Sequence, residues 1–535
     1  MPAVVWAAGE APRPPRPAPT WLASHHPSLQ AWAAASPTKK TASATRRRQT
    51  EDPLAPPCVG YYSGDNGGAT YVGVTGQEIR ILIYVYGGGE TLQGPIPSNA
   101  YYDLATPARQ GEPQVVTAFR NWQRYFNYRF QTYGRLVHTW VYFNNGTTTS
   151  AQMVADAAAN WTKVHPFAVV TVRSNTSAGP YIDAMEQHGV LAFGAWTLDR
   201  TQAELAQYPG LEWSFKPPVD SVARLFTSYV CAKVVPNPVN FSGDPGADGK
   251  RRVYGFMSSA DPTEPEVHVM QTEAEQELEA CGVHFAAIAS YPNAGGGNET
   301  DTDTNSEEAA ESNMAKFKEK GVTTILWASG EDTSESQAAA TLGYFPEWIT
   351  ADDGFNFDVD VNGRIQQQTE WAHAWVITPT TLWNANGNLP VEQTCYDAYT
   401  SVDPQVNTAD FSLTYACEEY DDLRQLFTGI QIAGADLTPT SMGEGFHAIP
   451  PHLSSTPDEP ACFYPAGMYN CVQDGVAMWW DPSTPAGPAY EGENDIGTWR
   501  VASNGARFAP GAWPPGQPTA QKRADDVANL NQGWD

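Results

Sequence analysis

The sequence is short of basic residues: 31 Lys and Arg stand against 60 Asp and Glu, so the 535-residue chain has a formal net charge of −29 at pH 7. This balance excludes a general nucleic-acid-binding protein, because binding to phosphates needs positive charge. No apolar run approaches the roughly 18 residues that a spanning helix needs. The patterns H-E-x-x-H and G-x-S-x-G are absent and Gly249-Lys250 is not a complete P-loop, so no common catalytic motif indicates an enzyme.

Cysteine is also scarce, with seven residues that are widely spaced and never form C-x-x-C. This spacing argues against a zinc site. Disulfides in an oxidising compartment fit the pattern better than the alternative, buried free thiols in a cytosolic protein. Spacing alone does not fix the disulfide connectivity. We predict three local pairs, which leave Cys58 without a predicted partner: Cys231 with Cys281, Cys395 with Cys417, and Cys462 with Cys471.

The first 50 residues differ from the rest in charge, since they hold seven basic side chains and one acidic side chain while the remainder is strongly acidic. They lack the apolar core of a signal peptide. Either the chain is cytosolic, or its start is misassigned and an upstream leader is missing. The charge step near Arg48 favours the second interpretation. We therefore expect an extracytoplasmic protein, secreted, periplasmic or at the cell surface, with residues 1–50 as a disordered or misassigned extension.

Beyond this extension, short apolar strands alternate with amphipathic helices, a rhythm typical of parallel α/β sheets. The 18 Trp, 24 Tyr and 20 Phe are too many for a disordered chain. In the first half we expect strands at 79–86, 135–143, 167–172 and 190–193, with helices at 113–130, from 150 and at 181–188. A helix at 220–234 leads to the Pro-rich connection 236–245, where we place a lobe boundary.

The rhythm restarts after this boundary, with strands at 252–257, 283–289, 322–327, 347–350 and 372–377 and helices at 264–280 and from 304 to Gly321. A long helix at 411–433 and strands at 472–479 and 498–501 follow. We predict two Rossmann-like α/β lobes joined by hinge strands near 217, 378 and 470, with a ligand cleft between them. The first lobe takes 51–235 plus 379–470, the second 236–378 plus 471–512, and 513–535 form a tail.

Polar and small side chains follow several of these strands, where ligands of open α/β sheets bind. Hydroxyls and helix-start N–H groups suit a carboxylate, and acidic groups suit an ammonium, so together they predict a site for a zwitterion. For any single residue, helix capping is the alternative role, and core packing is the alternative for Trp196. The candidate ligand-binding residues are Ser174, Asn175, Thr176, Ala195, Trp196, Thr197, Ser258, Ser259, Ser329, Glu331, Asp352 and Asp353.

Five segments, in this order, resemble the type I periplasmic-binding fold of solute-binding proteins for branched-chain amino acids in ABC transporters. They are Asn127 with Gly134-Arg135; Val169 to Ser177 followed by Gly189 to Phe193; Lys318 to Leu326; Phe411 to Leu426; and Gly497-Thr-Trp through Arg507. The resemblance covers roughly Val74 to Ala512 by element order. The chain departs from the family pattern in two places: the glycine pair expected before Gly134 is missing, and Ser258-Ser259-Ala-Asp replaces a Tyr-Gly pair.

The resemblance implies that the loop Ser174 to Thr176 and the turn Ala195 to Thr197 hold the carboxylate and amine region of the ligand. Asp352 or Asp353 then offers the ammonium partner. It further implies a non-enzymatic, monomeric protein that uses no cofactor, binds a small polar solute such as an amino acid or amide, and docks on an ABC permease in the membrane.

Two other functions stay open from the sequence. A ligand-sensing receptor module of the same fold works without transport, and a secreted carbohydrate-active hydrolase uses Glu331 with Asp352 or Asp353 as paired carboxylates. A weak calcium candidate is the series Asp358, Asp360 and Asn362, which matches the first half of an EF-hand loop but has Thr369 where the closing Glu belongs.

Overall fold

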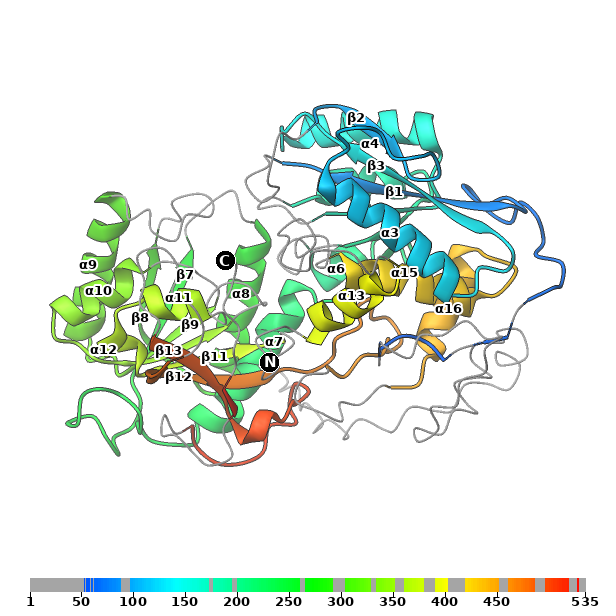
Figure 1. Ribbon diagram of the computed structural model, residues 1–535. Helices are drawn as coiled ribbons and strands as arrows, with labels where there is room; N and C mark the ends of the chain where they lie inside the picture. Colours follow the sequence, from blue (N-terminus) through cyan, green and yellow to red (C-terminus); the bar gives the residue numbers. More distant parts are fainter. Residues whose placement is uncertain are drawn as a thin grey trace, which may run out of the picture.

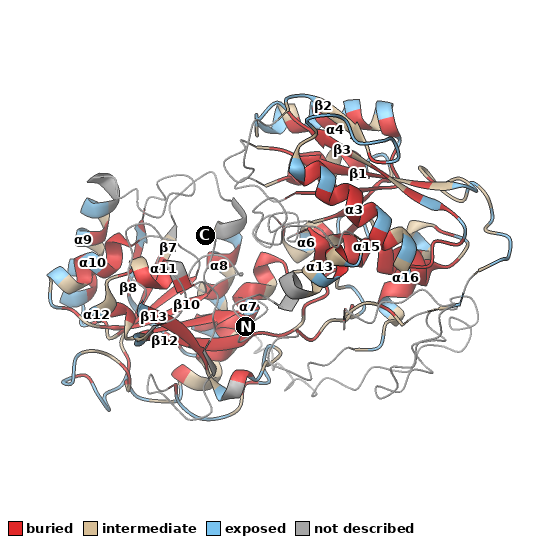
Figure 2. Cartoon of the chain, viewed as in Figure 1, coloured by how far each residue is buried: buried red, intermediate tan, exposed pale blue. Residues whose placement is uncertain are grey.

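The apolar strands assemble into two sheets, one of six strands and one of eight. The computed structural model describes residues 52, 54–57, 59–60, 62–87, 97–172, 177–194, 200–259, 265–291, 304–328, 333–351, 360–379, 390–402, 419–451, 460–485, 496–518 and 527–528. In these residues the chain forms two α/β lobes that lie side by side (Figure 1). The burial pattern in Figure 2 places the core of each lobe on its sheet and on the helix faces against it.

The first lobe is built on the six-stranded sheet, ordered β2-β3-β1-β4-β5-β6 and parallel except for β2. From Ile81 to Val85 its central strand is an apolar run buried on both faces, as expected for a parallel strand between helices. Its elements are β1 (Glu78–Val85), β2 (Ala100–Asp103), α3 (Gln114–Arg129), β3 (Leu136–Phe143), α4 (Ser150–Val164), β4 (Ala168–Thr171), α5 (Gly179–Glu186), β5 (Leu191–Phe193), α6 (Gln202–Leu205), β6 (Glu212–Trp213), α13 (Pro390–Thr400), α15 (Tyr420–Ala433) and α16 (Pro439–Ala448).

The second lobe is built on the eight-stranded sheet, ordered β14-β13-β12-β11-β10-β9-β7-β8. Its strands from β11 to β8 are parallel, and β12, β13 and β14 add to β11 as an antiparallel extension. Its elements are α7 (Val219–Tyr229), the π-helix η2 (Val230–Val234), β7 (Tyr254–Ser259), α8 (Pro265–Ala280), β8 (Phe285–Tyr291), α9 (Thr304–Glu319), β9 (Thr324–Ala328), α10 (Ser334–Thr341), β10 (Glu347–Ala351), α11 (Asp360–Ile365), α12 (Gln368–Trp371), β11 (Ala374–Thr378), β12 (Val476–Pro485), β13 (Ile496–Val501), η3 (Ser503–Gly505) and β14 (Val527–Ala528).

Two of the segments that cross between the lobes run side by side. Ser214, directly after β6, forms a parallel bridge with Asn470, and its backbone exchanges hydrogen bonds with Tyr469 and Cys471 at 2.9 and 3.0 Å. The third crossing begins after Thr378, at the end of β11. Since β6 and β11 both end at these crossings, the carboxyl edges of the two parallel sheets meet at the junction. This edge is where ligands bind in open α/β sheets.

The predicted boundary at residue 236 differs from the structure. Helix α7 belongs to the second lobe, because Val222, Leu225 and Phe226 pack in one core with strands of the second sheet. The first crossing therefore lies before α7, between Ser214 and Pro218. The apolar face of α7 was visible in the sequence, but its pattern does not show which sheet it covers.

The predicted C-terminal tail also begins too early. Trp513 is buried in the second core, and its indole Nε1 donates to Ser228 Oγ at 3.0 Å. Farther on in the predicted tail, Val527–Ala528 pair with β13. Pairing along the edge of β13 satisfies backbone groups that an exposed edge strand leaves unpaired.

The segment with Asn127, Gly134 and Arg135 has a structural role. The amide of Asn127 accepts from Val137 N and donates to Val137 O, both at 2.8 Å, and so braces the start of β3. Gly134 has a positive φ of 79°. Arg135 donates to the backbone oxygens of Thr75 and Ala435 at 2.7 and 2.9 Å, which ties distant loops of the first lobe together. These contacts within the first lobe explain the segment with Asn127, Gly134 and Arg135 without any role in ligand binding.

Two of the predicted disulfides are confirmed. Cys231 bonds to Cys281, joining η2 to the end of α8, and Cys462 bonds to Cys471 beside the second crossing. Cys395 is also disulfide-bonded, but Cys417 and Cys58 lie outside the described residues. None of the helices in the described ranges combines the length and apolar content needed to cross a membrane.

Candidate functional site

Most of the predicted ligand-binding residues lie outside the described part of the chain. This holds for the loops after β4, β5, β9 and β10, which carry Ser174, Asn175, Thr176, Ala195, Trp196, Thr197, Ser329, Glu331, Asp352 and Asp353, and for the side chain of Ser259. Ser258 lies near the carboxyl end of β7, as predicted, and its Oγ donates to Ala289 O at 3.4 Å. The roles of these residues therefore stay predictions.

The described residues include the carboxyl edge of the first sheet up to the start of the loops after β4 and β5. Thr171, the last residue of β4, donates from Oγ1 to the backbone oxygen of Gly194 at 2.8 Å. Gly194 follows β5 and has a φ of 83°; a Cβ there would lie 2.5 Å from Thr171 O. Only glycine fits this close approach without strain. The two strand ends are thereby fixed against each other where the predicted loop Ala195 to Thr197 begins.

The first turn of α15 brings two carboxylates to this edge. The carboxylate of Asp422 accepts a hydrogen bond from the backbone N–H of Gly194, and Lys216, on the first crossing, lies close enough to stabilise its charge. Asp422 is half-buried, and its neighbour Asp421 is buried. Arg424 forms ion pairs with Asp421 and, at 3.1 Å, with Asp52. The cluster thus joins α15, the end of β5 and a crossing segment.

The pKa values of the two carboxyl groups in this cluster, Asp421 and Asp422, are raised toward neutral pH. Burial raises the pKa of Asp421 to about 6, against the opposing charge of Arg424. Burial and then the charge of Asp421 raise the pKa of Asp422 to about 7, against Lys216, Arg424 and the Gly194 N–H. A nearby cation stabilises the ionised form of a carboxyl group whose pKa is raised in this way. An ammonium group that approached Asp422 would therefore lower the pKa of this carboxyl.

Arg200 also lies near this edge, and two ion pairs already occupy its charge. Arg200, directly after the predicted loop at 195–197, pairs with Glu212 at 2.9 Å and with Asp183 at 2.7 Å. Its backbone oxygen accepts from Val219 N, at the start of α7. With both sides of its guanidinium occupied, Arg200 positions the crossing rather than offering itself to a ligand carboxylate.

A stack of tyrosines lies beneath the carboxyl ends of β1 and β3. The ring of Tyr84 stacks on Tyr181 at 3.8 Å and on Tyr86 at 5.2 Å between centroids. Tyr84 and Tyr142 donate to the two oxygens of the buried Asp156, at 2.8 and 3.1 Å. Burial, followed by the charge of Asp156, raises the pKa of both phenols, so they stay neutral donors. The stack makes rigid the face of the first sheet that α4 and α5 cover.

The second lobe presents a buried polar turn after β9. Ser336 Oγ, in the first turn of α10, donates to Gln366 Oε1 at 2.8 Å and accepts from Gln367 N at 3.1 Å. Thr333 and Ser334, next to the predicted loop at 329–331, are also buried. These contacts hold the start of α10 against the chain that follows α11, and so position the loop that we expect to face the first lobe.

The calcium hypothesis does not fit the described residues. Asp360 begins helix α11 and is fully buried, and its carboxylate accepts from Thr498 Oγ1 and Trp499 N, both at 2.8 Å. An EF-hand needs this residue in a loop with its oxygens free for the ion. Asn362 is in the same helix, and Asp358 lies outside the described residues. Within the described ranges, no three His, Cys, Asp or Glu side chains form a metal-binding group.

Sequence reasoning missed Asp422 and the tyrosine stack. The signal for the stack was present in the run Ile-Tyr-Val-Tyr at 83–86, where phenols alternate with apolar side chains, but nothing in it named Asp156 as their acceptor. For Asp422 the signal was weaker. An acidic pair in the first turn of a helix is an ordinary feature that favours the helix dipole.

No protein family model matches the sequence, and no curated protein matches it. Solved structures do resemble its fold. An ABC transporter substrate-binding protein from Aeropyrum pernix matches with a TM-score of 0.51 and 10% identity, over 81% of this chain and 96% of that chain. A leucine-, isoleucine-, valine-, threonine- and alanine-binding protein from Brucella ovis, in a closed conformation, has a TM-score of 0.49 and 13% identity, over 83% and 98% of the two chains. A branched-chain amino acid ABC transporter ligand-binding protein from Burkholderia xenovorans has a TM-score of 0.49 and 11% identity, over 81% and 96%. The two sheets and the match to the Aeropyrum pernix structure confirm the predicted two-lobed α/β architecture of type I periplasmic binding proteins.

Proposed function

We propose that this chain is the extracytoplasmic solute-binding protein of an ABC importer and that it binds a small polar solute with an ammonium group, such as an amino acid or a related amide. The observation that carries the proposal is the position of Asp422, at the carboxyl edge of the first sheet and next to a crossing segment. A half-buried carboxylate at this edge is the partner that an ammonium requires. The fold shared with the Aeropyrum pernix substrate-binding protein supports the same role.

The loops after β4, β5, β9 and β10 would supply the remaining contacts. On this proposal, hydroxyls of Ser174 and Thr176 and backbone N–H groups near the start of α5 hold the solute's carboxylate or carbonyl. Asp422 takes the ammonium from the side of the first lobe. Asp352 or Asp353 and Ser258 approach from the second lobe.

The mechanism follows from a ligand that contacts both lobes. Such a ligand binds the closed arrangement better than the open one and shifts the population toward it. The paired crossings at Ser214 and Asn470 and the third at Thr378 would bend as the lobes move. The closed form would then dock on a membrane permease, and the two disulfides favour an oxidising compartment outside the cytoplasm.

A thermal-shift panel on the full chain tests the proposal, with free amino acids, short amides and sugars at millimolar concentration. A solute at about 100 times its Kd adds roughly 2.7 kcal/mol to the free energy of unfolding, which raises Tm by a few degrees. We expect a response to at least one ammonium-bearing solute, and a much smaller one in Asp422→Asn. Asp248→Asn, an exposed acid in the second lobe, is the matched control. Equal responses in Asp422→Asn and the control would remove Asp422 from the site.

A further inference from the structure

The N-terminal segment that carries Asp52, Leu54 and Pro57 packs against the first lobe beside the candidate site. Leu54 packs against the first core, and its backbone N–H donates to Asp52 Oδ1 at 2.8 Å. The side-chain amide of Gln431, on α15, donates to Pro57 O at 3.1 Å. These contacts give Asp52 a defined position next to α15.

Asp52 shares one guanidinium with Asp421. Its carboxylate is buried, and Oδ2 accepts from Arg424 Nη1 and from Tyr420 Oη, both at 3.1 Å. The same Nη1 atom of Arg424 forms the ion pair with Asp421. One cation therefore serves two carboxylates, one from the N-terminal segment and one from the first turn of α15. Each carboxylate is neutralised less than it would be if it had Arg424 to itself.

Arg424 also contacts the first crossing between the lobes. Its guanidinium lies over the ring of Phe215, 5.0 Å from the centroid. The backbone oxygen of Phe215 in turn accepts from Val472 N at 3.0 Å, where the second crossing runs alongside. The side chain that Asp52 holds thus touches both the candidate site and the chain that joins the lobes.

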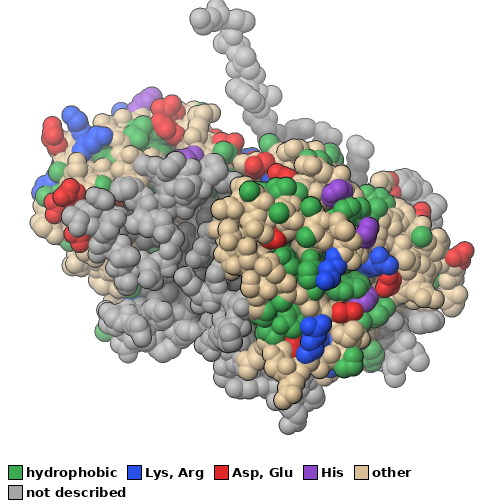
Figure 3. All heavy atoms as spheres, turned by 90° about the horizontal axis from the view of Figure 1, so that it is seen from above, with side chains coloured by type: hydrophobic (Ala, Val, Ile, Leu, Met, Phe, Trp, Pro, Cys, Tyr) green, Lys and Arg blue, Asp and Glu red, His purple; other side chains and the backbone are tan. Residues whose placement is uncertain are grey.

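Charged groups in this cluster interact strongly because they are close and poorly hydrated. Three are acidic and two are basic, which gives a net charge of −1 when all are ionised: Asp52, Asp421, Asp422, Lys216 and Arg424. Exposed charges of both signs are interspersed on the face of the molecule in Figure 3, where solvent screens them. Asp52, Asp421 and Arg424 are buried and are screened much less. The cluster itself therefore dominates the electrostatic potential at Asp422.

Phenols complete the surroundings of the cluster. Tyr420 donates to Asp52, and Tyr464 lies within range of the charge of Asp422. Tyr125, on α3, packs beside Tyr420 with ring centroids 6.4 Å apart. Burial raises the pKa of Tyr420 and of Tyr464, so both stay uncharged near neutral pH.

The influence of Asp52 passes along α15 to the candidate site. Burial raises the pKa of Asp421 against the charge of Arg424, and Asp52 raises it further. Burial and then Asp421 raise the pKa of Asp422. Removing the charge of Asp52 would leave Arg424 to neutralise Asp421 more completely, and the site at Asp422 would lose negative potential.

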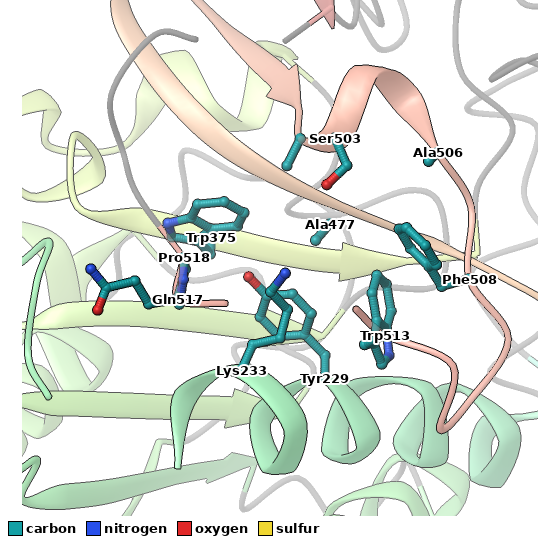
Figure 4. Close-up of a pocket in the computed structure, with 11 residues that line it drawn as sticks. Tyr229, Lys233, Trp375, Ala477, Ser503, Ala506, Phe508, Trp513, Gln517 and Pro518 are labelled. Atoms are coloured by element: carbon teal, nitrogen blue, oxygen red, sulfur yellow. The ribbon is translucent and has the colours of Figure 1, made fainter. Parts of the chain in front are cut away.

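The small cavity of the second lobe lies apart from this cluster. Its volume is about 40 Å³, and Figure 4 shows Tyr229 and Lys233 on one side of it and Trp375 on the other. One water needs about 10–15 Å³, so the cavity takes a few waters and is too small for a solute. It does not compete with the carboxyl edges of the sheets as a place for a charged ligand.

We propose that the N-terminal segment regulates the site at Asp422. Asp52 divides the charge of Arg424 and so sets the negative charge that Asp422 presents to an ammonium ligand. The inference rests on the proposed function for its ligand, but the link between Asp52 and Asp422 can be measured without one. Asp52 is a positioning residue, since it acts through Arg424 and Asp421.

Urea unfolding of the full chain at pH 5 and pH 7.5, without solute, tests the link. The folded state holds protons on Asp421 and Asp422 that the unfolded state releases, so their contribution to the urea midpoint falls as pH rises across this range. In Asp52→Asn both carboxyls should ionise at lower pH, and the midpoint should fall by about 0.2 M less than in wild type. Other titrating groups are common to all variants and cancel in this comparison.

Two variants separate the charge of Asp52 from its packing. Tyr420→Phe removes the hydrogen bond to Asp52 and keeps the charge, and Asp52→Glu keeps the charge on a longer side chain. Both should show the wild-type difference between pH 5 and pH 7.5. An equal change in Asp52→Asn and Tyr420→Phe would assign Asp52 a structural role only and would overturn the proposal.

Calorimetric titration with glycinamide and with alanine, which both carry an ammonium group, then tests the effect on binding. At pH 8 we expect Asp52→Asn to bind about threefold more weakly than wild type, with the pH midpoint of binding about half a unit lower. Glu444→Gln, at an exposed position of α16, should bind as wild type does.

The two experiments distinguish the possible failures. Equal pH dependence of the urea midpoint in wild type and Asp52→Asn would overturn the inference, whether or not a solute binds. A changed urea profile with no binding of glycinamide or alanine to wild type would support the charge link and count against the proposed function. Equal affinities of wild type and Asp52→Asn from pH 6 to 8 would contradict the regulation of binding.

Discussion

Arg507 Nε donates to Asp474 Oδ1 at 2.8 Å, and Arg507 Nη2 donates to Pro379 O at 2.6 Å. One buried guanidinium therefore joins the chain that leaves the second lobe after Thr378 to the chain that returns before β12. The next residues continue the contact, since Phe508 and Gly475 exchange two backbone hydrogen bonds. A Cβ at Gly475 would lie 2.5 Å from Thr378 O, so this approach requires glycine. The two strands are clamped at the point where lobe movement must begin.

We expect Arg507→Ala to lower the free energy of unfolding by about 3–5 kcal/mol, because it leaves the carboxylate of Asp474 buried without its partner. Denaturant unfolding measures the loss. Arg80→Ala is a suitable control, since Arg80 pairs with Glu78 at a partly exposed position and should cost less than about 1 kcal/mol. Similar losses for the two variants would contradict the role of Arg507 as a buried clamp.

Solute affinity should depend on pH through Asp422. Its pKa is raised to about 7 by burial and the charge of Asp421, so near pH 7 roughly half of the free protein carries this group protonated. An ammonium ligand lowers that pKa, and binding therefore releases a proton and strengthens as pH rises from about 6 to 8. Calorimetry of an ammonium-bearing solute in buffers of different ionisation enthalpy counts the protons. Asp422→Asn should bind about tenfold more weakly and lose the proton release; unchanged release in this variant would point to another group.

Stability should fall as pH rises because of Glu370. Burial raises its pKa to about 8, with the Trp348 indole hydrogen bond opposing, from an ordinary value of 4.5. Between these values the folded state keeps a proton that the unfolded state releases, so the free energy of unfolding decreases with pH across this window. Relative to wild type, Glu370→Gln should gain on the order of 3 kcal/mol between pH 4 and pH 8.5. Urea unfolding at both pH values checks this, with the exposed Glu319→Gln as control; parallel wild-type and Glu370→Gln pH profiles would refute it.

The two disulfides should differ in their contribution to stability. Cys231–Cys281 closes a loop of 50 residues and Cys462–Cys471 one of 9. Loop-closure entropy gives about 4 kcal/mol for the first and about 2.6 kcal/mol for the second. Replacing each pair by serines and comparing urea midpoints measures the difference. A larger loss from the shorter loop would show that local packing near the second crossing outweighs chain entropy.

The sequence was sufficient for most of the parallel strands, for several of the helices between them and for the class of fold. The buried part of β1 from Ile81 to Val85 and the strand β4 are largely apolar, and α9 ends two residues before Gly321, whose φ of 68° suits glycine. The sequence did not show which lobe contains α7, because the apolar face of a helix does not indicate which sheet it packs against. It also missed the role of Asp422, which arises only when the start of α15 meets the end of β5. Local patterns predict elements, whereas contacts between distant elements need the assembled chain.

The central claim is that the two lobes close on a solute bound at the carboxyl edges of their sheets. Small-angle X-ray scattering tests it most directly, on the full chain with and without a saturating solute that raises Tm in the panel. We predict a smaller radius of gyration with the solute, and a reduced response at the same concentration in Asp422→Asn. Superimposable scattering curves with and without a saturating solute would contradict the account.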